Sequence, residues 1–198
     1  TSSFKSTIAA LELAFFTINV TSKNLPASFK DTYNALEKIG FSAKDSLIVI
    51  DDYYPSSKKY EANQMERTAQ EIIRSYGDRT GRARMNADTS LKQTYIPRGN
   101  AILTAEDNPQ IGESGMARIV NVELSREMVN IALLTEVQNN ALDLNKTMHL
   151  FIKWLAPQAD ELPTMLKDMF LDFRKRAYNS ESHARMAESI AFMQVGFT

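Results

Sequence analysis

The hydrophobic and polar positions along the chain predict a mixture of strands and helices up to Ser125 and helices alone after it. Short β-branched runs predict strands buried on both faces, over residues 46–51, 100–105 and 117–124. Helix-forming stretches accompany them over residues 7–16, 29–39 and 58–76. After Ser125 the pattern is helical only, which predicts helices over residues 125–139, 143–156, 160–178 and 181–197.

Polar residues and glycines mark the boundaries of these elements. Ser28 is expected to cap the second helix and Gly40 to end it, while Gly77 ends the third. Residues 21–28 predict a loop. Residues 79–98 are basic and contain glycine, which predicts a hairpin or an extended loop.

Strands that alternate with helices, followed by helices alone, predict an α/β protein in two parts. The first is a sheet layer over residues 1–124 and the second an all-α subdomain over residues 125–198. The 198 residues are 43% hydrophobic and 24% charged, as expected for a globular chain with one domain, or one domain and a smaller appendage. No apolar run approaches the roughly 18 residues that span a bilayer, so no membrane partner is expected.

The composition removes several kinds of chemistry. The chain has no cysteine, which excludes disulfides and thiolate metal sites and is compatible with a reducing cytoplasm. Its two histidines argue against a histidine-rich metal site and a Ser-His-Asp hydrolase. The formal net charge is -1, so any basic surface for nucleic acid must be local.

Lys5 and Ser6 open the first predicted helix. In a P-loop, the backbone N–H groups at a helix N-terminus hold phosphates, the lysine reaches the β- and γ-phosphates, and the next hydroxyl binds Mg²⁺. Here the motif is partial, because Phe4 stands where the last glycine belongs and the first glycine would precede residue 1. An ordinary helix start is the alternative interpretation.

Two acids follow the first buried strand. Asp51 and Asp52 come after Leu47-Ile48-Val49-Ile50, as in a Walker B strand that delivers carboxylates to the rim of a sheet. Asp51 would hold Mg²⁺ through its water shell, and Asp52 would orient or deprotonate the attacking water. A surface turn after a core strand would explain the same residues.

The order of these pieces resembles known helicases. The segments TSSFKS, LTAEDNP, SGMARIVNVEL and SHARMAESIAF resemble the P-loop, sensor 1, arginine-finger and sensor 2 segments of the minichromosome maintenance (MCM) family. A closer resemblance is to AAA+ helicase-like ATPase domains of bacterial mobile elements and prophages. It is carried by Phe4-Lys5-Ser6, Asn34-Ala35-Leu36-Glu37, Asp51-Asp52, Gly81-Arg82-Ala83-Arg84 and Trp154-Leu155-Ala156. The chain departs from that family at Ser2, where glycine is usual, and at Asp52, where glutamate is usual.

The resemblance implies an AAA+ P-loop NTPase with a three-layer core, here without its first core strand, that binds ATP and Mg²⁺. Its nucleotide segment would comprise Ser2, Ser3, Phe4, Lys5, Ser6 and Thr7, with Ser6 and Asp51 at the metal. Asp52 would be catalytic, with sensor 1 being Thr104, Glu106 or Asn108. Arg118 would act as an arginine finger on a neighbouring subunit. Arg185 would be sensor 2, or else a surface arginine on an amphipathic helix.

A local basic segment points to DNA. Residues 79–98 carry Arg79, Arg82, Arg84, Lys92 and Arg98 against the single acid Asp88, a local charge of +4. Such a segment can neutralise phosphates and release their counterions. Arg82, Arg84 and Lys92 are therefore predicted to contact DNA, with a solvated loop as the alternative.

The resemblance as a whole implies a cytoplasmic hexameric ring that translocates on single-stranded or forked DNA during replication of a mobile element or phage. Two other hypotheses remain open. One is an AAA+ ATPase with a different output, such as a chaperone, packaging or initiator ATPase. The other is a non-catalytic DNA-binding or oligomerisation module whose ATP site has decayed.

Overall fold

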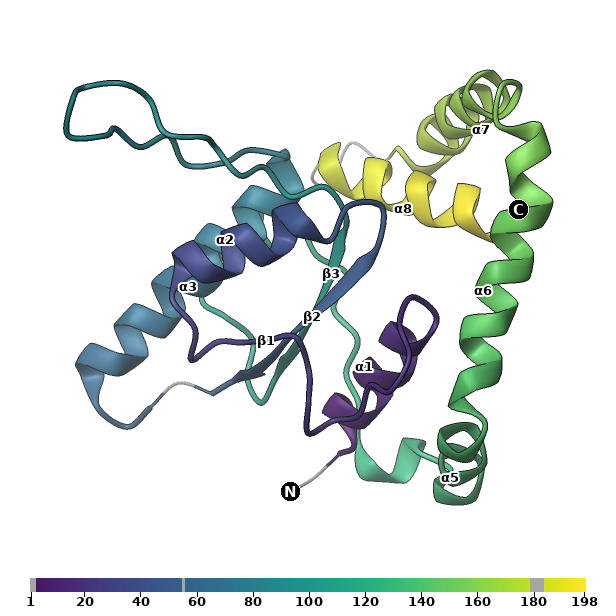
Figure 1. Ribbon diagram of the computed structural model, residues 1–198, viewed down its shortest axis with the longest axis horizontal. Coiled ribbons are helices and arrows are strands. Elements are labelled where there is room, and N and C mark those ends of the chain that lie inside the picture. Colours follow the sequence, from purple (N-terminus) through teal and green to yellow (C-terminus); the bar gives the residue numbers. More distant parts are fainter. Residues whose placement is uncertain (1–2, 55, 179–183) are drawn as a thin grey trace. The chain divides into compact units, whose positions relative to one another are not determined.

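The computed structural model describes residues 3–54, 56–178 and 184–198. The chain forms two compact units, one comprising Thr1–Gln110 and Glu123–Thr147 and the other comprising Ile111–Val122 and Met148–Thr198. The first unit holds a small parallel sheet and the second is helical (Figure 1). The predicted mixed α/β class is therefore confirmed.

The sheet of the first unit contains β1 (Ala27–Ser28), β2 (Leu47–Tyr53) and β3 (Asn100–Ala105) in that spatial order. All the pairings are parallel, with Ile50 opposite both Ala27 and Leu103. The register of β2 against β3 shifts between Ile50 and Tyr53, where Asp52 adopts a left-handed backbone with φ 67°. Parallel pairing brings the carboxyl ends of the three strands to the same edge.

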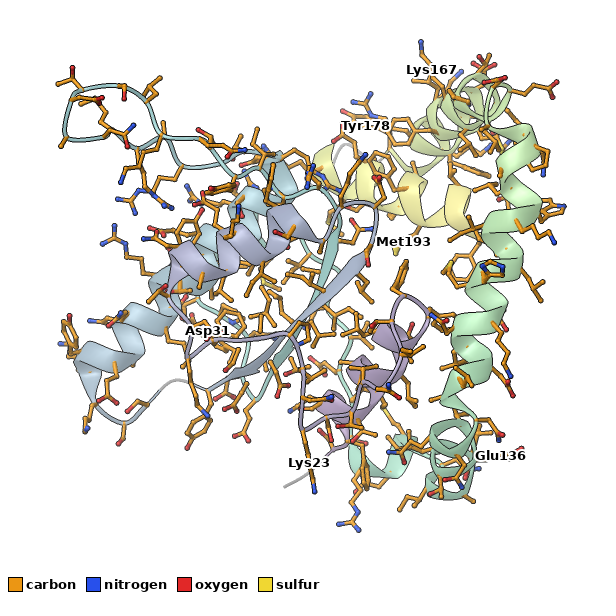
Figure 2. All side chains as sticks on the ribbon, in the orientation of Figure 1. Lys23, Asp31, Glu136, Lys167, Tyr178 and Met193 are labelled. Carbon is orange, nitrogen blue, oxygen red and sulfur yellow. The ribbon has the colours of Figure 1, made fainter. Side chains whose placement is uncertain are left out.

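Helices cover both faces of this sheet because β2 is apolar on both. Val49 packs on one face against Ala9 and Leu13 of α1 (Lys5–Ala14). Ile48 and Ile50 point to the other face, against α2 (Tyr33–Ser42) and α3 (Lys59–Asp78). Each buried aliphatic side chain of this kind contributes about 2 kcal/mol. Figure 2 shows the side chains that fill these layers.

Several predicted boundaries move in the structure. The segment predicted as a loop contains β1, because two residues are too few to produce a pattern, and Ser28 belongs to that strand. Thr32 therefore caps α2, with its hydroxyl accepting from the Ala35 N–H at 3.3 Å. Gly40 lies inside α2 rather than ending it, and Gly77 lies inside α3.

The third predicted strand, over residues 117–124, is wrong. These residues, all of them described, form a turn and extended chain after the short helix α4 (Gly112–Met116). Val120 and Val122 are exposed. Their β-branched side chains favour an extended backbone, but a strand also needs a neighbour for its N–H and C=O groups.

Four helices follow, as predicted, although the first begins at Ile131 rather than at residue 125, and residues 181–183 of the last prediction lie outside the described residues. The four helices are α5 (Ile131–Asn139), α6 (Ala141–Leu155), α7 (Leu162–Ala177) and α8 (Ala184–Phe197). Short 3₁₀ turns at Arg126–Met128 and Ala156–Gln158 precede α5 and follow α6. Helices α7 and α8 pack closely together, with Phe170 and Phe192 rings 4.6 Å apart between centroids.

Residues 79–98 form an arm, the name used from here on for this segment. It is a long hairpin-like excursion with one isolated antiparallel bridge, between Met85 and Leu91 (Figure 1). Backbone hydrogen bonds from Lys92 to Arg84 and from Asn86 to Ser90 hold its two sides together. The predicted hairpin or extended loop is confirmed.

Candidate nucleotide site

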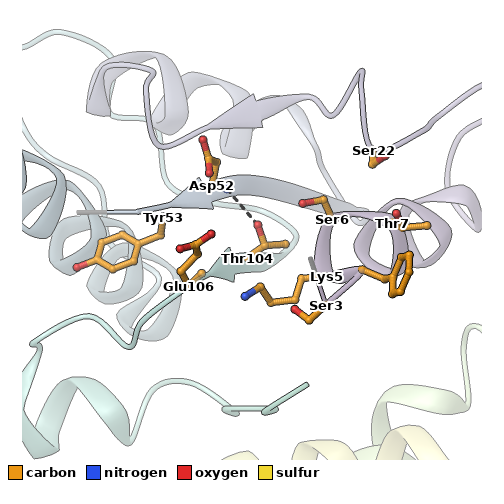
Figure 3. A pocket seen from close by; sticks show the side chains of 11 residues that line it. Ser3, Lys5, Ser6, Thr7, Ser22, Asp52, Tyr53, Thr104 and Glu106 are labelled. Carbon is orange, nitrogen blue, oxygen red and sulfur yellow. Dashed lines mark hydrogen bonds between the residues drawn. The ribbon is translucent and has the colours of Figure 1, made fainter. Parts of the chain in front are cut away.

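A cavity of about 470 Å³ opens where the start of α1 meets the carboxyl ends of β2 and β3. It is lined by Ser3, Phe4, Lys5, Ser6, Thr7, Ser22, Asp52, Tyr53, Thr104, Ala105 and Glu106. Figure 3 shows the Lys5 side chain reaching from α1 across this space toward Glu106. Ligands of open α/β folds bind at this edge of the sheet.

The start of α1 presents free backbone donors to the cavity. Phe4, at the N-cap position, makes no side-chain capping bond, and the first turn contains no acid. Phe4 also adopts a left-handed backbone, with φ 60° and ψ 16°, a conformation that glycine takes easily and other residues rarely. Position 4 therefore has the backbone expected of the glycine that the P-loop pattern places there.

Asp51 joins the three elements around the cavity. Its Oδ1 accepts a hydrogen bond of 2.7 Å from the Ser6 hydroxyl and another from the Thr104 hydroxyl. The Thr104 hydroxyl in turn accepts from the Asp52 N–H at 3.0 Å. The two residues predicted to bind Mg²⁺ thus touch directly, although they are 45 positions apart in the sequence.

Asp52 has a partner that the sequence did not reveal. Its Oδ2 lies 2.7 Å from the ammonium of Lys30, and both side chains are substantially exposed. This hydrogen bond raises the pKa of Lys30. The pairing follows from the register that sets Ser28 opposite Asp51, because Lys30 follows two residues later. A two-residue strand gives no sequence signal for it.

Tyr53 and Glu106 close another side of the cavity. The Tyr53 hydroxyl donates to Glu66 of α3, and burial followed by this hydrogen bond raises the pKa of Tyr53. The Glu106 N–H donates to the Tyr53 carbonyl at 3.1 Å, which fixes the exposed Glu106 at the rim. Ser22 and Tyr53 line the cavity but were not among the predicted site residues.

Some of the predicted residues line the cavity and others are not among its lining residues. Thr104 and Glu106 line the cavity, whereas Asn108 is exposed in the chain after β3 and is not among the lining residues. Arg118 and Arg185 belong to the second unit. The Arg118 guanidinium bonds to the Ser114 hydroxyl at 2.8 Å and to its carbonyl oxygen. Ser2 lies outside the described residues.

The cations of the arm serve different purposes. The Arg79 guanidinium donates to the carbonyls of Pro97 and Gly99. Arg84 pairs with Glu37 of α2, whose side chain is 1% exposed and also accepts from the Arg82 N–H at 3.0 Å. Arg84 thus anchors the arm, while the side chains of Arg82 and Lys92 are exposed.

The cavity suits a magnesium nucleotide by its donor set. The hydroxyl of Ser3 is buried and has no hydrogen-bond partner among the described residues, so a polar group in the cavity would satisfy it. A single carboxylate with an adjacent hydroxyl fits Mg²⁺, which keeps several waters and takes its other ligands from phosphates. The described residues hold no group of three or more His, Cys, Asp or Glu side chains that would form a metal site without a nucleotide.

Comparison with protein-family models, with curated proteins and with solved structures found no match to this chain. The site therefore stands on its own geometry. Among the described residues, no helix combines the length and the apolar character needed to cross a membrane.

Proposed function

We propose that this chain is the ATP-hydrolysing core of an AAA+ ring motor that acts on DNA, a replicative-type helicase module of a mobile element or phage. One observation carries the proposal. At the carboxyl edge of a parallel sheet, Lys5 and Ser6 at a helix start line the same cavity as Asp52, and the Ser6 hydroxyl bonds to the neighbouring acid Asp51. That combination of groups is the one phosphoryl transfer from a nucleotide requires.

The proposed roles follow from the positions of the side chains. The N-terminus of α1 and the Lys5 ammonium would hold the phosphates, with Ser6 and Asp51 at the magnesium. The metal supplies neutralisation of phosphate charge. Asp52 would orient the attacking water, and Lys30 holds its carboxylate in place. Thr104 fits the sensor 1 role better than Asn108 because it touches Asp51 and the Asp52 backbone.

Nucleotide binding and turnover test the catalytic part of this proposal. In Lys5→Ala, affinity for a fluorescent ATP analogue is expected to fall at least tenfold, because Lys5 is the one lysine among the described residues that line the cavity. In Asp52→Asn, binding is expected to persist while turnover falls about 100-fold. Lys23→Ala, which removes an exposed lysine that does not line the cavity, serves as the control. Equal ATP affinity in Lys5→Ala and Lys23→Ala would reject the nucleotide site.

Strand displacement tests the DNA part. Arg82→Ala/Lys92→Ala removes two exposed arm cations and is expected to abolish unwinding of forked DNA while leaving basal ATP turnover intact. Arg84→Ala is less suitable, because it leaves the buried Glu37 without its ion-pair partner at a cost of about 3 kcal/mol. Normal unwinding by the double variant would exclude the arm from DNA contact. ATP turnover without any unwinding by the wild-type protein would favour a chaperone, packaging or initiator output.

A further inference from the structure

A group of aromatic rings and cations lies at the root of the arm, away from the cavity residues. Phe41 and Tyr95 stack edge to face, with centroids 5.2 Å apart. The Arg98 guanidinium lies 3.8 Å from the Phe41 ring centroid, and the Lys38 ammonium lies 4.3 Å from that of Tyr95. We call this group the aromatic–cation cluster. It joins the C-terminal half of α2 to the returning side of the arm.

The two cations are held in place but are not neutralised. Arg98 donates from Nε to the Phe41 carbonyl at 2.7 Å, so the C-terminal end of α2 fixes its orientation. Among the described residues, neither Lys38 nor Arg98 has a carboxylate partner. The nearby acids are engaged elsewhere, since Glu37 pairs with Arg84 and Asp45 pairs with Lys44.

These cations also reach the surface. Lys38 and Arg98 are exposed, while Phe41 and Tyr95 are half-buried. Both charges lie near the Phe41 ring, the Lys38 ammonium 5.8 Å and the Arg98 guanidinium 3.8 Å from its centroid. Side chains already ordered on rings lose little further rotamer entropy when they bind an anion, which favours binding.

A single-stranded nucleic acid fits this chemistry better than a duplex. Its phosphates match the two cations, and its bases are free to stack on a planar guanidinium or on an aromatic ring. The cluster is also continuous with the arm, because Tyr95 and Arg98 belong to the arm itself and Arg82 and Lys92 lie on the same segment.

We propose that the aromatic–cation cluster is a contact site for single-stranded nucleic acid, in which Lys38 and Arg98 bind phosphate oxygens and a base stacks on the open face of the Arg98 guanidinium. This inference rests on the proposed function, because the bound strand would be the one on which the motor acts. It adds a site outside the three arm residues predicted from sequence to contact DNA.

Fluorescence anisotropy with a labelled oligothymidine, measured over a range of salt concentrations on the full chain, tests the cluster. Lys38→Met keeps the apolar stem that packs near Tyr95 and removes only the charge. It is expected to weaken binding about fivefold and to lower the slope of log affinity against log salt by about 1. Lys38→Met/Arg98→Met is expected to weaken binding about 30-fold, with a slope lower by about 2.

Lys44→Met is the matched control, because Lys44 is an exposed lysine that follows α2 but pairs with Asp45. It is expected to leave affinity unchanged. Thermal unfolding followed by circular dichroism identifies any loss of fold. If Arg98→Met lowers the melting temperature, the exposed Lys38→Met alone decides the result.

The outcomes separate this inference from the proposed function. If the cluster variants bind oligothymidine as tightly as the wild type but Arg82→Ala/Lys92→Ala does not bind it, the cluster proposal is overturned and the proposed motor function is supported. Binding that depends on the cluster, in a protein without Lys5-dependent ATP turnover, would support the cluster and overturn the motor. Absence of oligothymidine binding by the wild type would overturn the cluster. The cluster proposal would also be overturned if Lys38→Met abolished binding to anionic phosphatidylserine vesicles but left the affinity for oligothymidine unchanged.

Discussion

Two buried tyrosine hydroxyls have opposite surroundings. The Tyr53 hydroxyl donates to Glu66, whereas the Tyr76 hydroxyl is buried without a hydrogen-bond partner among the described residues. It sits against Gly40 of α2, where a Cβ atom would lie 2.5 Å from it. A buried polar group without a partner loses its hydration and gains nothing in return.

Removing each hydroxyl should therefore change stability in opposite directions. Tyr76→Phe is expected to raise the free energy of unfolding by about 1 kcal/mol, and Tyr53→Phe to lower it by a similar amount. Urea denaturation at neutral pH measures both. Equal destabilisation in the two variants would mean that the Tyr76 hydroxyl has a partner in solution.

Alkaline pH gives an independent measurement on the same residue. Burial raises the pKa of Tyr76 to about 12, from an ordinary value of 10.0. Protonation of the Tyr76 hydroxyl therefore makes its full contribution to the free energy of unfolding below pH 10, and this contribution is lost as the pH rises toward 12. Stability should consequently fall less steeply over this interval in Tyr76→Phe than in the wild type.

The backbone of Phe4 leads to a further prediction at this scale. A left-handed conformation costs a residue other than glycine about 1 kcal/mol, and β-branching adds to that cost. Phe4→Gly is expected to retain nucleotide binding, whereas Phe4→Val loses about 1 kcal/mol of stability together with nucleotide affinity. Unfolding and nucleotide titrations check both variants. If Val is tolerated as well as Gly, the left-handed conformation is not required.

Only part of the site could be predicted at the scale of residues. The contact between Ser6 and Asp51 was foreseeable, because a helix start and a strand end carry recognisable residue types. The Lys30–Asp52 pair was not, since it depends on the register of a strand of two residues. Arg84 was predicted to contact DNA, but no sequence pattern showed that Glu37 would be buried beneath it.

Elements were predictable where their pattern was long or buried on both faces. β2 and α3 were identified for this reason. Residues 117–124 had the composition of a strand, but no strand in the described part of the chain pairs with them, which only the three-dimensional arrangement decides. Gly40 was expected to end α2, yet it lies within the helix where Tyr76 approaches closely.

Gly99 controls the junction between the arm and β3. A Cβ atom at this position would overlap the backbone carbonyl oxygens of Ser46 and Ala43, which cannot move without disturbing the start of β2. Gly99→Ala is expected to lower the free energy of unfolding by about 2 kcal/mol or more. Thermal unfolding measures this loss.

Gly196 provides the matched control for that substitution. It lies in α8, where a Cβ atom would meet nothing within 4 Å. Gly196→Ala is expected to be neutral or stabilising by up to about 1 kcal/mol, because alanine favours helix. If both alanine variants behave alike, close approach at Gly99 does not determine stability.

The proposed ring makes a prediction about whole subunits. An arginine finger acts on the nucleotide of a neighbouring subunit, so the lysine and the finger of one working site would come from different chains. Lys5→Ala and Arg118→Ala proteins are each expected to lack ATP turnover. Mixing them is expected to restore a fraction of wild-type turnover, measured by phosphate release. Mixtures that remain inactive would place the finger elsewhere or exclude the ring.

The positive charges of the arm are distributed unevenly along its length, which affects where the arm can attract a charged polymer. The arm's five basic residues all lie outside the tip, residues 85–91, and the side chains of Arg79, Arg84 and Arg98 are already bound to the protein. The tip carries one acid and no base, with Met85 and Leu91 exposed. The arm is therefore polarised along its length. If the arm meets a polyanion as proposed, attraction is expected at the basic residues on either side of the tip and not at the tip itself.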